Sequence, residues 1–454
     1  MDLALLTVVG GTFFDSPAKV IFAIVLLLPI LFFGGSVLYL WALMSSSLTG
    51  RNRLVELYPL ASDTNSNPNS PSQNLVAPSS ALSVAEFPRF AVLIPAHNEE
   101  LLLGLALESL NRLEYPRDRF HLVVVADNCS DRTAGIAREK GAIALERFNT
   151  DKIGKGYALE WALEHLLGQS PSSELIEISQ FDAVVILDAD TQVASNLLST
   201  FAASMGSGEK AMQVRYEVLN PYESWRTKLM CCALSLVHIV KPLGRERWKL
   251  SDGLKGNGMC FAREVVERVP WSGESITEDI EYTIRLCRAG YRVAFLPESA
   301  VWAQMPTTGA QSASQRKRWE GGRYHLLSKV APALLMEGLK KRDWKLLDRA
   351  VELIIPPFAE MFAFPFVFML ACLATSVVLH WQIAVAYTLC FALMLIMQAV
   401  YLFGGMWIAK VPASIARTAL YAPGYIVWKF ALYGVMIATR SAGGWKRTER
   451  RSVD

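Results

Sequence analysis

Two long tracts without a charged residue restrict this chain more than any other feature. The first runs from Val20 to Ser47 and the second from Met361 to Ala409. A helix needs about 20 apolar residues to cross a bilayer, so the first tract predicts one span and the second predicts two. His380 stands near the middle of the second tract, where a turn would divide it into spans at Leu353–Leu379 and Ile383–Ile408.

The charges beside these tracts predict their orientation. Arg51 and Arg53 follow the first span directly. Lys and Arg accumulate on the cytoplasmic side of membrane proteins, so the domain that follows should lie in the cytoplasm. The sequence therefore predicts a multi-pass protein of the inner (plasma) membrane.

Two further apolar stretches are less regular. Ala416–Thr439 contains Lys429 near its middle and is followed by a basic tail, so an interfacial or re-entrant helix is favoured over a full span. Leu229–Val240 has only 12 uncharged residues, which is too short to span. It is either a buried core helix or a helix in the membrane plane.

Composition excludes several classes of protein. Only 19% of the 454 residues are charged and the net charge is +3, which does not favour a nucleic-acid partner. The seven cysteines form no CxxC pair, so neither a disulfide framework nor a zinc site is indicated.

The chain is expected to divide into six parts. They are an N-terminal segment with one span (1–54), a Ser/Asn/Pro-rich linker (55–86), a folded polar domain (87–330), an interfacial connection (331–352), two spans (353–410), and a third C-terminal span or interfacial helix with its basic tail (411–454).

Short β-rich runs alternate with helical stretches in the polar domain. The expected strands are Ala91–Ile94, His121–Ala126, Ala183–Leu187 and Arg292–Leu296. Helices are expected over Leu101–Leu113 and from a cap at Ser130 to Lys140. This alternation predicts an α/β domain with a mostly parallel sheet, covered by helices on both faces.

Polar clusters follow three of these strands. They are Pro95–Glu100, Asp127–Asp131 and Asp188–Asp190. Ligands of such sheets bind outside the carboxyl ends of the strands, so the clusters are expected to share one site.

Several residues of this polar domain could bind a metal ion, a phosphate or a nucleoside, and each also has a plainer interpretation. Asp188 and Asp190 could hold a divalent ion against a diphosphate, or could form a solvated turn. Asp127 could accept hydrogen bonds from a base or ribose, or form a turn, and Lys155 could bind phosphate at a helix start, or be a loop lysine.

Two later motifs also have both a functional and a plainer interpretation. Glu278 and Asp279 are either acidic residues of a helix start or include a general base. The run Gln315–Trp319 is either a basic surface beside the membrane or a site for diphosphate and a sugar ring.

Taken in order, these motifs resemble those of the membrane-embedded family-2 glycosyltransferases, which include cellulose, hyaluronan, chitin and poly-N-acetylglucosamine synthases. The resemblance covers about Phe90 to Tyr324 and the flanking spans. It implies a GT-A fold (Rossmann-like) for the cytosolic domain.

The resemblance also implies roles for single residues. Those expected to bind the nucleotide sugar are Pro95, His97, Glu99, Asp127, Lys155, Asp188, Gln315 and Arg318. Asp190 would bind Mg²⁺ or Mn²⁺, Asp279 beside Glu278 would be the general base, and Trp319 would form the acceptor platform.

The resemblance is incomplete, and three functions stay open. His97 stands where the family usually has Tyr, and a Phe-x-Val-Thr gating loop is not found. The favoured function is an inverting, metal-dependent transfer from a UDP-sugar to a β-linked polysaccharide, with a homo-oligomer or export partner completing a channel. The alternatives are transfer of one sugar to a lipid acceptor and, less favoured, an inactive membrane scaffold.

Overall fold

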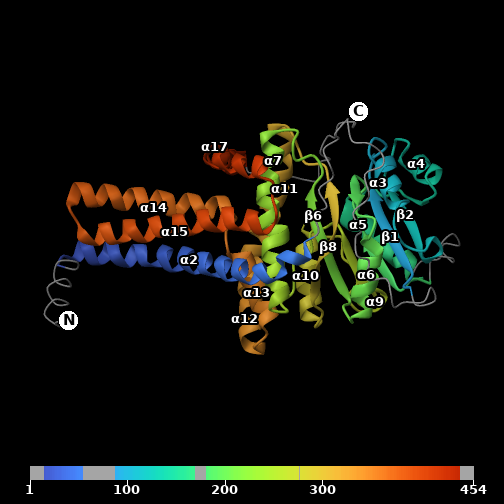
Figure 1. Ribbon diagram of the computed structural model, residues 1–454, viewed down its shortest axis with the longest axis horizontal. Helices are drawn as coiled ribbons and strands as arrows, with labels where there is room; N and C mark the ends of the chain where they lie inside the picture. Colours follow the sequence, from blue (N-terminus) through green and yellow to red (C-terminus); the bar gives the residue numbers. More distant parts are fainter. Residues whose placement is uncertain (1–14, 55–86, 169–179, 276, 440–454) are drawn as a thin grey trace.

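The computed structural model describes residues 15–54, 87–168, 180–275 and 277–439. Figure 1 shows three long helices extending from one end of the molecule and a twisted sheet at the other end. A layer of helices lies between them and runs across the axes of the long helices.

The sheet has eight strands in the order β3-β2-β1-β4-β7-β6-β8-β5. They are β1 (Phe90–Ala96), β2 (Phe120–Asp127), β3 (Ile143–Arg147), β4 (Ala183–Ile186), β5 (Thr191–Val193), β6 (Ala211–Val218), β7 (Met259–Ala262) and β8 (Val293–Ala303). The expected α/β sheet is confirmed. It is parallel from β3 to β4, but β7 is antiparallel to both of its neighbours and β5 is antiparallel to β8, so the sheet as a whole is mixed.

Helices cover both faces of the sheet, as expected. One face packs against α3 (Leu103–Leu110), α4 (Thr133–Glu139) and α6 (Leu197–Gly206). The other packs against α5 (Lys155–Leu166), α9 (Arg263–Arg268) and α10 (Glu278–Arg288). Strands buried on both faces explain the continuous apolar runs of β1, β2 and β4.

The predicted cap at Ser130 is wrong. Helix α4 begins at Thr133, and Arg132 occupies its N-cap position. The Asp131 carboxylate accepts a hydrogen bond from the Thr133 backbone N–H at 3.0 Å, while the Ser130 N–H donates to Asn98. Ser130 therefore lies in the loop after β2 and not at the start of α4. Its N–H binds Asn98, in the loop after β1.

The three long helices are α2 (Pro17–Ser47), α14 (Phe358–Leu379) and α15 (Gln382–Ile408), and they lie side by side (Figure 1). Phe33, Cys372, Phe391 and Met394 belong to one continuous apolar cluster between them. A short 3₁₀ helix, η1 (Leu48–Arg53), continues α2. By length and composition these helices could each cross a membrane.

The short apolar run Leu229–Val240 is part of a longer helical segment. Helix α7 (Trp225–Ser235), the π-turn η5 (Leu236–Val240) and α8 (Lys241–Arg247) are continuous, and among the described residues this is a fourth segment long and apolar enough to span. In Figure 1 it runs across the long helices. Helix α8 packs so closely on α2 that a Cβ on Gly244 would lie 2.3 Å from the Leu43 carbonyl oxygen.

The remaining helices lie between β8 and α14 or after α15. They are α11 (Gly309–Lys329), α12 (Ala331–Lys341), α13 (Trp344–Ile354), α16 (Ala413–Ala416), η6 (Arg417–Tyr421) and α17 (Ala422–Thr439), with a short turn η3 (Arg117–Arg119) before β2. The Lys429 ammonium of α17 is 1% exposed and lies 2.8 Å from the Glu360 carboxylate of α14. This ion pair accounts for a lysine inside an apolar helix.

Candidate active site

The three polar clusters leave the sheet at one edge, as the sequence predicts. Strand β1 pairs in parallel with β2 and with β4, so the carboxyl ends of all three strands point the same way. Pro95 is the register partner of Val125, near the end of β2. The loops that follow therefore start side by side.

Hydrogen bonds join the loops after β1 and β2. His97 Nδ1 donates to the Asp127 carbonyl oxygen at 2.7 Å, and the Glu99 backbone N–H donates to Thr133 Oγ1 at 2.9 Å. Asn98 and Asn128 have φ values of +54° and +50°, a left-handed conformation that asparagine tolerates better than most residues. The two loops thus form one rigid rim.

Asp127 forms a buried ion pair with Arg147 at the end of β3. Both side chains are 5% exposed, and a second nitrogen of Arg147 donates to the Lys152 carbonyl oxygen at 2.9 Å. The arginine therefore orients one carboxylate oxygen of Asp127. The sequence analysis missed Arg147 because it did not predict β3.

Lys155 connects the start of α5 to the end of β4. Its ammonium forms an ion pair with the Asp188 carboxylate and donates to the Gly256 carbonyl oxygen at 2.6 Å. Burial lowers the pKa of Lys155, but the charges of Asp188 and Glu278 outweigh this and leave the pKa raised. Lys155 therefore stays protonated and carries a positive charge at the carboxyl edge of the sheet.

Glu278 and Asp279 form the first turn of α10. Burial raises the pKa of Glu278 to about 7; the neighbouring Asp279 adds to this, and Lys155 opposes it. Burial also raises the pKa of the Asp279 carboxyl. A carboxylate that titrates near neutral pH is suited to general base chemistry.

The loop 251–258, between α8 and β7, brings these groups together. A Cβ placed on Gly256 would lie 3.6 Å from Asp279 Oδ2 and 3.7 Å from Lys155 Nζ. Asn257 spans the Asp188–Asp190 motif: its Oδ1 accepts from the Asp188 backbone N–H at 3.1 Å, and its Nδ2 donates to Thr191 Oγ1 at 2.8 Å. Sequence reasoning missed this loop.

Asp190 lies between β4 and β5 and is 8% exposed. Together with Asp188 it offers two carboxylates within one turn at the edge where Lys155 lies. Mg²⁺ and Mn²⁺ prefer carboxylate oxygens and complete their shell with water and phosphate, so this donor set fits such an ion.

The predicted residues Gln315, Arg318 and Trp319 lie on α11, and their side chains fall outside the described part of the chain. The backbone of α11 nevertheless approaches the site. A Cβ on Gly322 would lie 2.2 Å from Thr277 Cγ2, directly before Glu278. Helix α11 therefore passes beside the start of α10.

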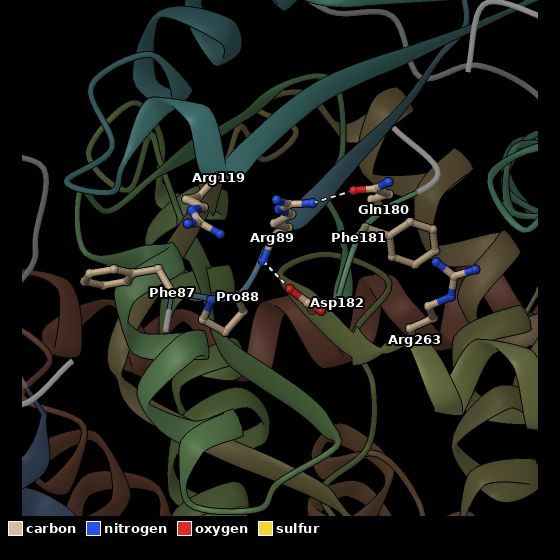
Figure 2. Close-up of a pocket in the computed structure, with 8 residues that line it drawn as sticks. All are labelled: Phe87, Pro88, Arg89, Arg119, Gln180, Phe181, Asp182 and Arg263. Atoms are coloured by element: carbon tan, nitrogen blue, oxygen red, sulfur yellow. Dashed lines mark hydrogen bonds between the residues drawn. The ribbon is translucent and has the colours of Figure 1, made fainter. Parts of the chain in front are cut away.

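A separate hollow of about 590 Å³ lies at the opposite edge of the sheet (Figure 2). It is lined by Phe87, Pro88, Arg89, Arg119, Gln180, Phe181, Asp182 and Arg263, several of which directly precede β1 and β4. Arg89 donates from its side chain to Gln180 and from its backbone to Asp182. The hollow is therefore distinct from the cluster around Gly256.

Comparison with known proteins agrees with this architecture. Residues 88–322, just over half of the chain, match the family "Glycosyltransferase like family 2". The chain is 28% identical over 254 residues to the probable glycosyltransferase YdaM of Bacillus subtilis, covering 54% of this chain and 58% of YdaM. It is 27% identical to the β-monoglucosyldiacylglycerol synthase of Trichormus variabilis, covering 60% of this chain and 57% of that protein.

The matched regions thus span a little less than three fifths of the length of these relatives. Among solved structures, the mannosyltransferase PcManGT from Pyrobaculum calidifontis, in complex with GDP-Man and Mn²⁺, is similar with a TM-score of 0.47. The two are 20% identical, over 83% of this chain and 97% of PcManGT. On the match over residues 88–322 and the α/β sheet, the chain belongs to glycosyltransferase family 2, with a GT-A domain in its polar middle part.

Proposed function

We propose that this protein transfers one sugar from a nucleotide-sugar donor, a UDP-sugar, to a hydroxyl group of a membrane lipid. The observation that carries the proposal is the convergence of Lys155, Asp188 and Asp279 around Gly256. A cation for phosphate and a candidate base lie within one small site, as a displacement at a sugar carbon requires.

The reaction is a single displacement at the anomeric carbon. Asp279, with Glu278 beside it, takes the proton from the acceptor hydroxyl as the acceptor oxygen bonds to that carbon. The bond from the carbon to the diphosphate breaks, and its electron pair leaves with the nucleoside diphosphate. Because the acceptor attacks from the side opposite the leaving group, the anomeric configuration inverts.

Other residues of this chain bind and orient the donor. Lys155 lies where it would balance negative charge on the diphosphate. Asp127, held by Arg147, would accept hydrogen bonds from the nucleoside, with the rim formed by Pro95, His97 and Glu99 beside it. Gln315 and Arg318 are proposed to bind the diphosphate and Trp319 the acceptor, on the basis of the resemblance.

A divalent cation fits the proposal. Asp188 and Asp190 would hold Mg²⁺ or Mn²⁺, and the ion would supply positive charge to the diphosphate.

The position of the site relative to the long helices supports a lipid acceptor. Arg349 of α13 lies 3.2 Å from the Cβ position of Gly253, in the loop that carries Gly256. The neighbouring residue, Asp348, accepts a hydrogen bond from the hydroxyl of Tyr39, in α2, at 2.6 Å. If α2 spans the inner membrane with the GT-A domain in the cytoplasm, the side chains of Arg349, Asp348 and Tyr39 link the loop 251–258 to α2 near the membrane surface.

A β-linked polysaccharide is the second candidate. The Gln315-x-x-Arg318-Trp319 motif favours it, because that motif resembles polymer-making members of the family. However, α2, α14 and α15 pack through a continuous apolar cluster, so a polymer passage would require further copies or a partner chain.

The test is to incubate the purified protein with a panel of nucleotide sugars, Mn²⁺ or Mg²⁺, and bacterial lipids. Nucleotide release that requires lipid and yields a glycolipid with one sugar supports the proposal. A long product from the same donor establishes the polysaccharide instead. If no donor is cleaved under any condition, the inactive scaffold is favoured.

A further inference from the structure

The hairpin of α12 and α13 lies at one end of the layer of helices between the sheet and the long helices, and it projects away from the axes of the long helices (Figure 1). One side of it is buried through Leu334, Leu346 and Ala350, which pack with residues of α10 and α11. The two helices approach so closely that a Cβ on Gly338 would lie 2.9 Å from Leu347 Cγ. The hairpin is therefore a fixed part of the fold.

The hairpin of α12 and α13 contacts α2 at a level that would correspond to one face of a bilayer. Lys19 and Tyr39 are twenty residues apart in α2, which corresponds to about 30 Å at 1.5 Å per residue and equals the hydrocarbon thickness of a membrane. Tyr39 is bonded to Asp348 of α13. With the hydrocarbon beginning at Lys19, the first charged residue beside the apolar tract, α13 meets α2 where the hydrocarbon would end and the headgroups begin.

The turn of the hairpin, defined as residues 336–345 and so including the end of α12 and the start of α13, exposes large apolar side chains. Met336 is 52% exposed, Leu339 is 55% exposed and Trp344 is 74% exposed. Met336 and Leu339 are three residues apart and share one side of α12. Tryptophan is enriched at membrane interfaces, where its ring suits the headgroup level.

Basic residues surround these apolar side chains. Lys340, Lys341, Arg342 and Lys345 lie within six positions of each other. Lys341 pairs with Glu337, and Asp343 accepts hydrogen bonds from the start of α13. Within the described part of the chain no carboxylate pairs with Lys340, Arg342 or Lys345, so the turn carries a surplus of positive charge.

We infer that the turn formed by residues 336–345 is a docking surface for anionic phospholipid headgroups. Its apolar side chains would enter the interface while its basic side chains contact lipid phosphates. The inference rests on the proposed placement of α2 in a bilayer, and it does not depend on the sugar acceptor. A surface of this kind would fix the rotation of the GT-A domain against the membrane.

Photocrosslinking in lipid nanodiscs tests this inference. The full chain would carry p-benzoylphenylalanine in place of Leu339, in discs of equal phosphatidylglycerol and phosphatidylcholine, and the adducts would be identified by mass spectrometry. Leu28, in the middle of α2 and 72% exposed, is the positive control. Leu101, in the GT-A domain and 50% exposed, is the matched negative control.

We expect lipid adducts at positions 339 and 28 but not at 101, with phosphatidylglycerol enriched at 339 relative to 28 by at least roughly fivefold, the factor that corresponds to about 1 kcal/mol for a single basic residue near the membrane surface. Lys340→Glu with Lys345→Glu should remove that enrichment, whereas Arg112→Glu, in the GT-A domain, should not. Adducts at 28 without adducts at 339 would overturn the inference, as would equal yields of both lipids at 339. Absence of adducts at 28 would overturn the placement of α2 in the bilayer and the inference with it.

Discussion

Replacing Lys155 with methionine should move the acidic limb of the pH–rate profile to higher pH. Lys155 Nζ and Asp279 Oδ2 both lie within 4 Å of one point beside Gly256, so they are at most about 7 Å apart. The Lys155 side chain is 27% exposed, for which an effective dielectric constant of about 20 is appropriate. Coulomb's law then gives roughly 2 kcal/mol, which corresponds to between one and two pKa units.

The sign follows from the charge that is lost. Lys155 stabilises the ionised forms of Glu278 and Asp279, so its removal raises their pKa values further, and Glu278 starts at about 7. A base that must be deprotonated then becomes active only at higher pH. The assay is nucleotide release against pH, measured as kcat/KM.

Lys152→Met is the matched control, because it also removes one lysine charge, three positions before Lys155. The Lys152 ammonium lies over the Tyr157 ring, 5.5 Å from its centre. The control should leave the acidic limb in place. An acidic limb that stays unchanged in Lys155→Met, or that moves to lower pH, would refute the electrostatic coupling of Lys155 to the acidic pair.

Three further changes test other parts of the site and fold. Asp279→Asn should reduce sugar transfer by at least about 100-fold while calorimetry still detects donor binding, and full activity would exclude Asp279 as the base. Asp190→Asn should raise the Mn²⁺ concentration needed for half-maximal nucleotide release, and an unchanged requirement would contradict a metal role. Gly244→Ala would place a Cβ 2.3 Å from the Leu43 carbonyl oxygen, so the free energy of unfolding should fall by about 1–3 kcal/mol in a thermal unfolding assay, whereas Gly206→Ala, with no atom within 4 Å, should have little effect.

Much of the architecture could be predicted because it depends on local sequence signals. Absence of charge from Val20 to Ser47 marks α2, since a charged side chain is expensive in hydrocarbon. Apolar runs ending in Asp127 and Asp188 mark the carboxyl ends of β2 and β4. Parallel pairing then brings those ends together without any knowledge of tertiary contacts.

Other parts of the site depend on contacts that the sequence does not display. Arg147 becomes a partner of Asp127 only when β3 pairs with β2. Asn257 contacts Asp188 only because the loop 251–258 folds back over the end of β4, with Gly256 at a φ of +76°. Such a loop has no periodic pattern, so a single sequence does not distinguish it from other glycine-rich turns.

The measurement that most directly tests the proposed function is the acceptor dependence of nucleotide release by the purified protein in nanodiscs. With the matching donor and Mn²⁺ or Mg²⁺ present, we predict release that requires a lipid acceptor, stops when the metal is chelated, and yields a lipid bearing one β-linked sugar. A product that keeps growing in length, or release that needs neither lipid nor metal, would contradict the proposed transfer to a membrane lipid.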